Sequence, residues 1–483
     1  MTINAEQYEV VVGLEVHAQL STRSKLFCGD DASFGGEPNT HISPISLGYP
    51  GTLPVLNATA VEYAIKMGLA CHCEIERTNY FARKNYFYPD LPKGYQISQH
   101  TTPICIGGFV KINTSAGEKK IILNRIHLEE DAGKSVHDRD PENTCLDYNR
   151  AGVALIEIVT EPCIANGDEA YAYLTELRKL LRFLEVCDGN MEEGSMRCDA
   201  NISIRKKNET RLGTKVEVKN LNSIRNVKRA IELEANRMIE LVEHGGTVVQ
   251  QTRSFDATKG TSFALRSKEE ANDYRYFTEP DLPPFVISES YLAKIRSEIP
   301  SLPEELIAKF TSDYQLTDYD ARIICDDRET VSYFQELISN TSQYKAAANW
   351  VIGPVKSYLN EQNITISAFP IQPSRLANLM KLIEEGKINF SIASSRIFPE
   401  MIKDQKEEPI DVATRLNLIQ SADSNEVEAW VQQVLMRMPD KVEEYRKGKK
   451  GLIGLFVGEV KKISKGKADP KLTNQLLLEK LQN

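Results

Sequence analysis

The first part of the chain alternates apolar and polar residues with the period of two that is typical of β-strands. One such strand covers residues 13–20, where Glu15 and His17 fall on the polar face and apolar side chains on the other. Residues 197–205 and 215–219 repeat the pattern with charges of both signs. A single polar face is typical of a strand that faces solvent. Several charged strands in one domain instead favour a sheet curved around a polar site.

Helical periodicity is rare before residue 292 and dominates after it. Two helices are predicted in the first part, over residues 169–184 and 223–244, and a pair of glycines ends the second. Further on, Ser301-Leu302-Pro303-Glu304 has the capping-box pattern with proline in the first turn, and Thr317 starts another helix.

These changes of pattern predict an α+β chain with three domains. Residues 1–292 are expected to form a strand-rich domain, 293–408 a helical domain, and 409–483 a small helical tail domain. The segment from Phe398 to Pro409 has proline near both ends and several charged residues, so it is expected to be a hinge.

Composition is that of an ordinary globular protein, with 41% hydrophobic and 26% charged residues. At 483 residues the chain exceeds the roughly 250–300 residues that one core usually holds. The nine cysteines are an odd number, and residues 1–6 lack the basic start and apolar core of a signal peptide. A cytoplasmic protein with reduced thiols is expected. The apolar run at 451–458 is shorter than the roughly 20 residues of a membrane span, so no membrane contact is expected.

Charge is distributed unevenly along the chain. The formal net charge of −9 argues against a surface that binds nucleic acid throughout. Residues 411–483 nevertheless hold 13 basic and 10 acidic side chains, with basic clusters at 446–450 and 461–467. Such clusters are often only a solvated face, but a small basic module with glycines beside it is also suited to contact RNA.

Acidic residues inside three strand-like apolar segments give the first indication of chemistry. Residues 13–17, 127–131 and 155–159 each place carboxylates among apolar neighbours. A buried carboxylate is costly unless it is paired or coordinates a cation. Strands that face one site could combine hard oxygen ligands with the imidazole of His17, which suits a magnesium ion that carries a nucleotide. From the carboxylates alone, calcium binding or plain salt bridges would fit as well.

An aromatic-rich segment supplies candidate cationic groups. Residues 83–96 hold Lys84 and Lys93 among several tyrosines, and residues 273–281 form a second aromatic segment. Each could be a packed loop anchored by its rings. Alternatively, the rings hold the two lysines beside the acidic cluster, where they would meet phosphate or a substrate carboxylate.

Common nucleotide and amidase motifs are missing from the sequence. Gly133-Lys134-Ser135 resembles the end of a phosphate-binding loop, but Leu128 stands where the first glycine is required. There is no Gly/Ser-rich amidase signature either. If the reaction uses ammonia, another chain must release it.

Seven blocks and the tail together resemble a known family, the B subunits of the aspartyl/glutamyl-tRNA amidotransferases. The resemblance covers nearly the whole chain, and residues 466–477 are similar to the tail of that family. The blocks are Gly13–His17, Arg83–Gln96, His127–Ser135, Asn149–Pro162, Glu192–Ser203, Gly213–Ile224 and Asp273–Pro284.

The resemblance implies an enzyme that works with ATP and magnesium on charged tRNA. The B subunit phosphorylates the side-chain carboxylate of Glu-tRNA(Gln) or Asp-tRNA(Asn), and ammonia from a separate glutaminase (amidase) subunit displaces the phosphate. A small third subunit completes the heterotrimer. The implied fold is a cradle of antiparallel sheet related to glutamine synthetase, followed by a helical domain and a helical tail that holds the tRNA.

The resemblance also assigns site residues. The implied magnesium ligands are Glu15, His17, Glu129 and Glu157. The implied catalytic or path-lining residues are Lys84, Lys93, Glu130, Arg197 and Asp199, of which Lys84 and Arg197 would also contact ATP. Because neighbours on a strand face opposite ways, either Glu129 or Glu130 could be the ligand.

One departure from the family pattern concerns zinc. Many members carry Cys-x-Cys followed by Cys-Pro-x-Cys, which resembles a four-thiolate zinc site. Here the two segments read Cys28-Gly29-Asp30 and Ser43-Pro44-Ile45-Ser46. Since one thiol of four is left, no zinc is expected.

Two alternative functions fit parts of the sequence. A non-catalytic tRNA-binding scaffold would need only the basic tail, but the complete set of implied metal ligands argues against it. An ATP-dependent ligase that acts alone on a free amino acid could use free ammonium. Its ATP hydrolysis would not depend on charged tRNA.

Overall fold

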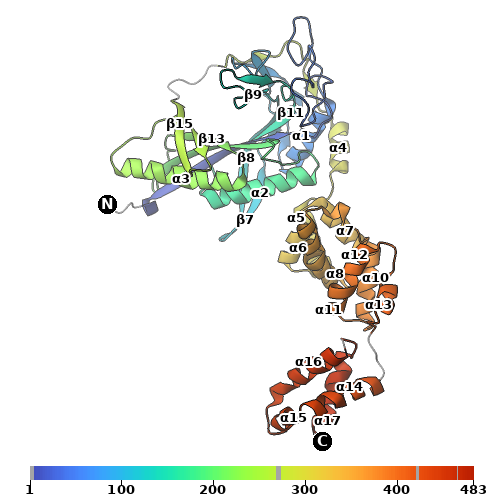
Figure 1. Cartoon of the computed structure of the whole chain (residues 1–483). Helices are drawn as coiled ribbons and strands as arrows, with labels where there is room; N and C mark the ends of the chain where they lie inside the picture. Colours follow the sequence, from blue (N-terminus) through green and yellow to red (C-terminus); the bar gives the residue numbers. More distant parts are fainter. Residues whose placement is uncertain (1–4, 268–273, 420–423, 465, 483) are drawn as a thin grey trace. The chain divides into compact units, whose positions relative to one another are not determined.

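The computed structural model describes residues 5–267, 274–419, 424–464 and 466–482. The chain divides into two compact units, residues 1–302 and residues 303–483. The first combines a large sheet with a few helices and the second is helical, so the chain is α+β as predicted (Figure 1).

The first unit is built around one large sheet. Its strand order is β15-β14-β13-β12-β1-β11-β8-β5-β4-β16, with β2, β6 and β7 attached at β8 or at each other. The strands of the chain are β1 (Tyr8–Gln19), β2 (Glu74–Ile75), β3 (Thr78–Asn79), β4 (Ala82–Asn85), β5 (Tyr95–Ser98), β6 (Cys105–Ile106), β7 (Phe109–Thr114), β8 (Gly117–Glu130), β9 (Lys134–Val136), β10 (Cys145–Asp147), β11 (Ala154–Thr160), β12 (Met196–Lys206), β13 (Val216–Leu221), β14 (Gln251–Asp256), β15 (Thr261–Ser267), β16 (Phe277–Thr278) and β17 (Phe285–Val286).

The sheet is mixed rather than wholly antiparallel. Strand β13 pairs in parallel with β14, and helix α3 (Ile224–Glu243) connects the two. A parallel pair requires such a crossover connection. The expectation of an antiparallel sheet is therefore wrong for this pair, whereas β1 pairs antiparallel with both β11 and β12.

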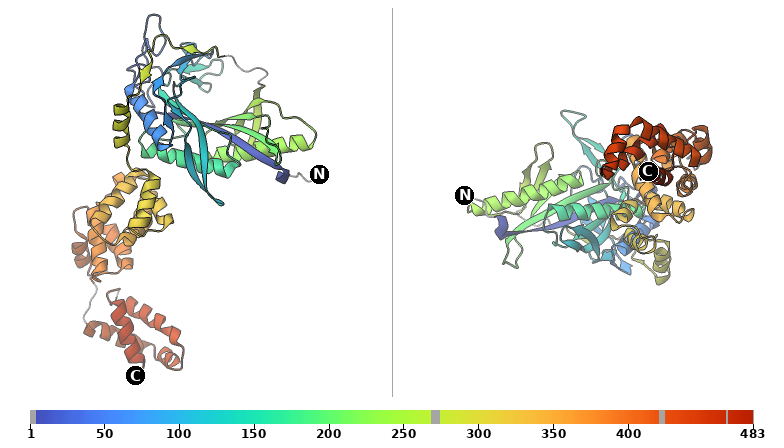
Figure 2. Two further views of the ribbon diagram at one scale, coloured as in Figure 1. Left: turned by 180° about the vertical axis from the view of Figure 1, so that it is seen from behind. Right: turned by 90° about the horizontal axis from the view of Figure 1, so that it is seen from below.

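Helices cover the apolar face of the sheet. The first unit contains α1 (Ala58–Ala70), α2 (Gly167–Phe183), α3 and α4 (Glu289–Glu298). Helices α2 and α3 lie side by side along the sheet in both views (Figures 1 and 2). Both predicted helices are confirmed, and Ser223 caps α3 by accepting from the Asn226 N–H.

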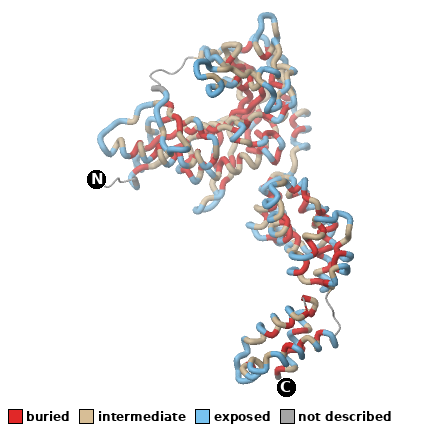
Figure 3. The backbone as a smooth tube through the Cα atoms, in the orientation of Figure 1, coloured by how far each residue is buried: buried red, intermediate tan, exposed pale blue. Residues whose placement is uncertain are grey.

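The core lies between these helices and the sheet (Figure 3). Leu14, Val16 and Ala18 of β1 are fully buried in it, together with Leu174 and Leu177 of α2. The alternation along β1 leaves its polar residues on the opposite face. The site described below is therefore built on the face that these helices leave free.

The secondary structure of the second unit is helical in the part that the structure describes. Its α-helices are α5 (Pro303–Asp313), α6 (Asp318–Ile324), α7 (Arg328–Ser339), α8 (Tyr344–Trp350), α9 (Lys356–Gln362), α10 (Pro373–Glu384), α11 (Phe390–Ile392), α12 (Phe398–Lys403), α13 (Pro409–Arg415), α14 (Ser424–Arg437), α15 (Pro439–Arg446), α16 (Ile453–Ile463) and α17 (Pro470–Gln482). The predicted cap at Thr317 is confirmed, because its side chain accepts from the Asp320 N–H.

The predicted hinge is wrong over its first half. Helix α12 begins at Phe398, with Pro399 in its first turn, and buries both Phe398 and Met401. Proline is tolerated there because the first helical N–H groups need no partner within the helix. Packing of these two apolar side chains keeps the segment helical despite its charges.

None of the helices in the described residues is long and apolar enough to cross a membrane.

Candidate active site

A row of polar residues crosses four neighbouring strands on the free face of the sheet. In register, Arg197 of β12 lies opposite His17 of β1, His17 opposite Glu157 of β11, and Glu157 opposite His127 of β8. Glu129 lies two residues beyond His127 on β8 and so faces the same way. Segments far apart in the sequence thus meet at one place.

Three of these side chains form a group with the geometry of a cation site. The ligand atoms of His17, Glu129 and Glu157 all lie within 4.8 Å of one another. His17 Nε2 is 3.4 Å from Glu157 Oε2 and 3.7 Å from Glu129 Oε1. Two carboxylates and one imidazole are a donor set that divalent magnesium or manganese accepts. The residues present therefore fit such an ion.

The electrostatics of the group match this interpretation. Burial opposes protonation of His17, but Glu157 and Glu129 outweigh it and raise the pKa of His17 to about 9. Burial likewise opposes ionisation of Glu157, yet His127 and His17 hold its pKa below its ordinary value. The concentrated negative charge thus attracts a proton to His17 when no cation is bound, and a cation would replace it.

Glu15, a predicted ligand, lies outside this three-residue group. It faces Asp199 of β12, and its Oε1 accepts a hydrogen bond of 2.9 Å from Asn201 Nδ2. Burial, Glu157 and Asp199 raise the pKa of Glu15. Lys219 of β13 pairs with Asp199 and with Glu217, its Nζ lying 3.0 Å from Glu217 Oε1. The structure therefore places Glu15 and Asp199 together in a second acidic cluster beside the first.

Lys84 of β4 reaches the cation group from the other side. Its Nζ lies 5.1 Å from the ring centre of Tyr274 and 5.8 Å from that of Tyr86. Burial opposes its charge, but Glu129, Tyr276 and Glu157 outweigh burial and raise the pKa of Lys84. The two aromatic segments thus meet around Lys84, whereas the sequence interpretation placed both Lys84 and Lys93 beside the acidic cluster and Lys93 instead pairs with Glu130.

The second aromatic segment is fixed to β4 by a buried ion pair. Arg83 Nε donates to Glu279 Oε2 at 2.7 Å and Arg83 Nη2 donates to Glu279 Oε1 at 2.8 Å. Glu279 is almost fully buried. Together with the pairing of β16 with β4, this ion pair fixes the segment that carries Tyr274, whose ring centre lies 5.1 Å from Lys84 Nζ.

Arg197 is held by a carboxylate that the sequence patterns did not single out. Arg197 Nη2 donates to Asp131 Oδ2 at 2.8 Å, and Gln19 Nε2 donates to the same atom at 2.7 Å. Burial opposes ionisation of Asp131, but Arg197 and Arg150 keep its pKa below the ordinary value. Asp131 belongs to the acidic segment 127–131, but its cationic partner is distant in sequence, so no local signal identified it.

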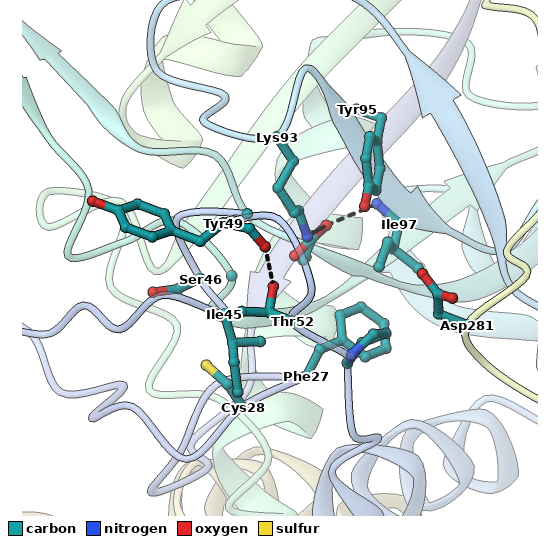
Figure 4. A pocket seen from close by; sticks show the side chains of 14 residues that line it. Phe27, Cys28, Ile45, Ser46, Tyr49, Thr52, Lys93, Tyr95, Ile97 and Asp281 are labelled. Atoms are coloured by element: carbon teal, nitrogen blue, oxygen red, sulfur yellow. Dashed lines mark hydrogen bonds and ion pairs between the residues drawn. The ribbon is translucent and has the colours of Figure 1, made fainter.

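Glu130 lines a separate pocket to which Glu129 does not contribute. Figure 4 shows Lys93, which lines the same pocket. There Glu130 pairs with Lys93 Nζ and accepts a hydrogen bond of 2.9 Å from the Ile97 N–H. The pocket has an empty volume of about 540 Å³, which includes its open mouth, and Cys28, Ser46 and Tyr49 line it further. Geometry thus places Glu129 with the cation group and Glu130 with Lys93.

The two segments that carry the four cysteines in many family members meet here at one carboxylate, that of Asp30. Ser46 Oγ donates to Asp30 Oδ2 at 2.6 Å. Burial opposes ionisation of Asp30, but hydrogen bonds from Ser46, Ser43 and Cys28 lower its pKa. Burial raises the pKa of Cys28 to about 11, so its thiol stays protonated. A hydrogen-bonded cluster therefore joins the two segments.

Comparison with known proteins identifies the class first. Residues 10–293 match the GatB/GatE catalytic domain, and residues 332–481 match the GatB domain. The first match contains every predicted site residue.

Similar proteins cover the whole chain. The chain is 48% identical over 479 residues to the B subunit of the aspartyl/glutamyl-tRNA(Asn/Gln) amidotransferase of Geobacter sp. (strain M21), covering 99% of this chain and 100% of that protein. It is 47% identical to the B subunit of Caldicellulosiruptor bescii over 479 residues, 99% of each chain. The same protein of Thermodesulfovibrio yellowstonii is 47% identical over 476 residues, 99% of this chain and 100% of that protein.

This chain belongs to the family of B subunits of the aspartyl/glutamyl-tRNA(Asn/Gln) amidotransferases. The family predicted from the sequence is confirmed, and so is the amidotransferase function over the non-catalytic scaffold.

Proposed function

We propose that the free face of the sheet binds ATP with a magnesium ion and phosphorylates the side-chain carboxylate of glutamate or aspartate carried on tRNA. The observation that carries this proposal is the group of His17, Glu129 and Glu157 with the cationic Lys84 beside it. A carboxylate is a poor acyl donor, and phosphorylation gives it a good leaving group. A bound magnesium ion would neutralise phosphate charge during the transfer.

Each remaining residue of the site has a role in positioning charge. Lys84 and Arg197 contact the phosphates from opposite sides. Each is held in place by its neighbours, Lys84 by tyrosine rings and Arg197 by Asp131. Prepositioned cations stabilise the charge that develops in the transfer. Glu15 and Asp199 form the edge of the site next to β12, where their carboxylates repel any anion other than the bound ATP.

The pocket at Glu130 gives ammonia a way to the acyl phosphate. Lys93 and Glu130 are a buried pair at its wall, and Glu130 is the direct neighbour of Glu129 in the chain. Because Glu130 and Glu129 face opposite ways on β8, ammonia in this pocket would still have to pass to the other face of the sheet to reach the cation group. The chain carries no amidase signature, so a separate glutaminase subunit supplies the ammonia, and a small third subunit completes the heterotrimer.

Each of the three predicted domains has its own role in this proposal. Residues 1–292 form the glutamine-synthetase-like cradle with the ATP site, 293–408 the helical domain and 409–483 the tail that contacts tRNA. The basic clusters at 446–450 and 461–467 support contact with phosphates. No zinc takes part, since the hydrogen bonds of Asp30 already join the segments that zinc would join.

The test uses the reconstituted heterotrimer with Glu-tRNA(Gln) and Asp-tRNA(Asn) as separate substrates. Glu157→Gln keeps size and hydrogen bonding but removes the charge, and it should abolish ATP-dependent amidation while glutaminase activity continues. Glu161→Gln, at a half-buried position just beyond β11 where an amide oxygen can still accept from Asn124 Nδ2, is the matched control and should leave amidation unchanged. Normal amidation by Glu157→Gln would refute the cation site.

ATP hydrolysis distinguishes the proposal from a ligase that acts alone. Hydrolysis should rise when the cognate charged tRNA is added and fall to background with uncharged tRNA. Hydrolysis at the same rate without tRNA would support the free amino acid as substrate.

A further inference from the structure

His127 is a buried histidine at the candidate cation site to which no role was assigned from the sequence. Its side chain is 5% exposed, and its Nε2 lies 3.5 Å from Glu157 Oε2 and 3.6 Å from Glu129 Oε2. It therefore touches both carboxylates of the cation group.

The sheet places two histidines on opposite sides of Glu157. His17 of β1 is its register partner on one side and His127 of β8 its partner on the other. The two imidazoles do not have equivalent positions. His17 shares the ligand group with Glu129 and Glu157, whereas no group of ligand atoms within 4.8 Å of one another in the described residues includes His127.

The remaining ring nitrogen of His127 differs from that of a typical metal ligand. Its Nδ1 is buried and has no hydrogen-bond partner among the described residues. A metal-bound histidine nearly always donates its other N–H to an acceptor, which keeps the free nitrogen on the metal. Here a proton on Nδ1 would be an unsatisfied buried donor. On Nε2, it faces the oxygens of Glu129 and Glu157.

We propose that His127 is a positioning residue, whose Nε2–H holds the carboxylates of Glu129 and Glu157 from the buried side so that both present an oxygen to the cation on the His17 side. This inference rests on the proposed function of the same site. Groups that orient metal ligands in this way commonly change metal affinity by about 10–100-fold when removed.

The test measures Mn²⁺ binding to the purified full chain by electron paramagnetic resonance, without any activity assay. In wild type, the electron spin echo of bound Mn²⁺ should show modulation by the nitrogen of one coordinated imidazole. His17→Gln should remove that modulation. His127→Leu should weaken Mn²⁺ binding about 10–100-fold and keep the modulation. His127→Gln should restore most of the affinity, since its amide N–H can still donate to the carboxylates.

Controls separate folding from positioning. His244→Gln changes an exposed histidine at the end of α3 and should bind Mn²⁺ like wild type. Thermal unfolding compares the variants, and if His127→Leu does not fold, the modulation and affinity of His127→Gln decide between the roles.

Three results would overturn the proposal. Modulation from two imidazoles in wild type, or loss of one in His127→Gln, would make His127 a ligand. Equal affinity of His127→Leu and wild type would leave it without a role. Whether His127 is a ligand or has no role, the assignment of the cation site to His17, Glu129 and Glu157 would remain valid. Absence of Mn²⁺ binding that depends on His17 would instead refute the proposed function together with this inference.

Discussion

Replacing Lys93 by methionine tests the buried ion pair at the wall of the pocket. The side chains of Lys93 and Glu130 are only 11% and 4% exposed. Methionine fills a similar volume but leaves the Glu130 carboxylate without its cation. Removing one partner of a buried pair typically costs about 3–5 kcal/mol, because the other charge stays desolvated. Lys93→Met should destabilise the surrounding strands by about that amount.

A second substitution separates the charge from the packing. Glu130→Gln removes the negative charge but keeps an oxygen for the Ile97 N–H, which now donates to Glu130 Oε1 at 2.9 Å. When Lys93→Met and Glu130→Gln are combined in a double variant, no buried charge is left without a partner. Its stability should return to within about 1 kcal/mol of wild type, the usual net value of one hydrogen bond. Amidation with glutamine as the nitrogen source should remain impaired, because the polar pair at the pocket is gone.

Hydrogen exchange of the full chain measures these changes where they occur. The free energy of opening is compared for peptides from β5 and β8, the strands that carry Ile97 and Glu130. Tryptophan fluorescence during urea unfolding is the internal control, since both tryptophans, Trp350 and Trp430, lie in residues 303–483. That signal should not shift.

Either of two results would refute the reasoning. An opening free energy in Lys93→Met within about 1 kcal/mol of wild type would show that Glu130 is effectively solvated. A double variant no more stable than Lys93→Met would show that lysine contributes by packing rather than by charge.

Four further predictions address other parts of the molecule. Arg83→Met should strand the buried Glu279 carboxylate, loosen the aromatic segment on β4 and weaken ATP binding measured by calorimetry; unchanged affinity would mean that the backbone pairing of β16 with β4 holds the segment by itself. Because the pKa of Asp30 lies below its ordinary value of 3.8, its contribution to stability is present above that pH and is lost as the pH falls through the folded pKa. Asp30→Asn should therefore destabilise the protein near neutral pH, with a deficit that shrinks in acid, and unfolding curves that stay parallel would contradict this; addition of a zinc chelator should not change the melting temperature of wild type. Removing residues 409–483 should weaken tRNA binding and flatten its salt dependence, and equal salt slopes would exclude the tail as a phosphate contact.

Local periodicity predicted the elements, and strand register decided the site. The alternation along β1 identified the polar face with Glu15 and His17 correctly, because a period of two fixes faces within one strand. The same rule showed that Glu129 and Glu130 differ but not which one meets His17. That depends on pairing between β8, β11 and β1, which is set by contacts far apart in the sequence.

The residues that sequence reasoning missed share one property. Asp131 and His127 both lie inside the acidic segment 127–131, yet their partners come from other strands. The incorrect hinge at Phe398 has the opposite cause. Its charges suggested an exposed linker, while two buried apolar side chains determine its structure.

The central place of β1 in the sheet has a consequence for biosynthesis. It is synthesised well before its partners β11 and β12, which begin only at Ala154 and Met196. At the usual rate of about 5–20 residues per second, the nascent β1 waits roughly 7–28 s with both edges unpaired, until β11 is made. During that time its apolar residues, including Val16, are free to bind a chaperone or another chain. A ribosome that stalls before residue 154 therefore releases a fragment that can neither close the sheet nor assemble the cation site.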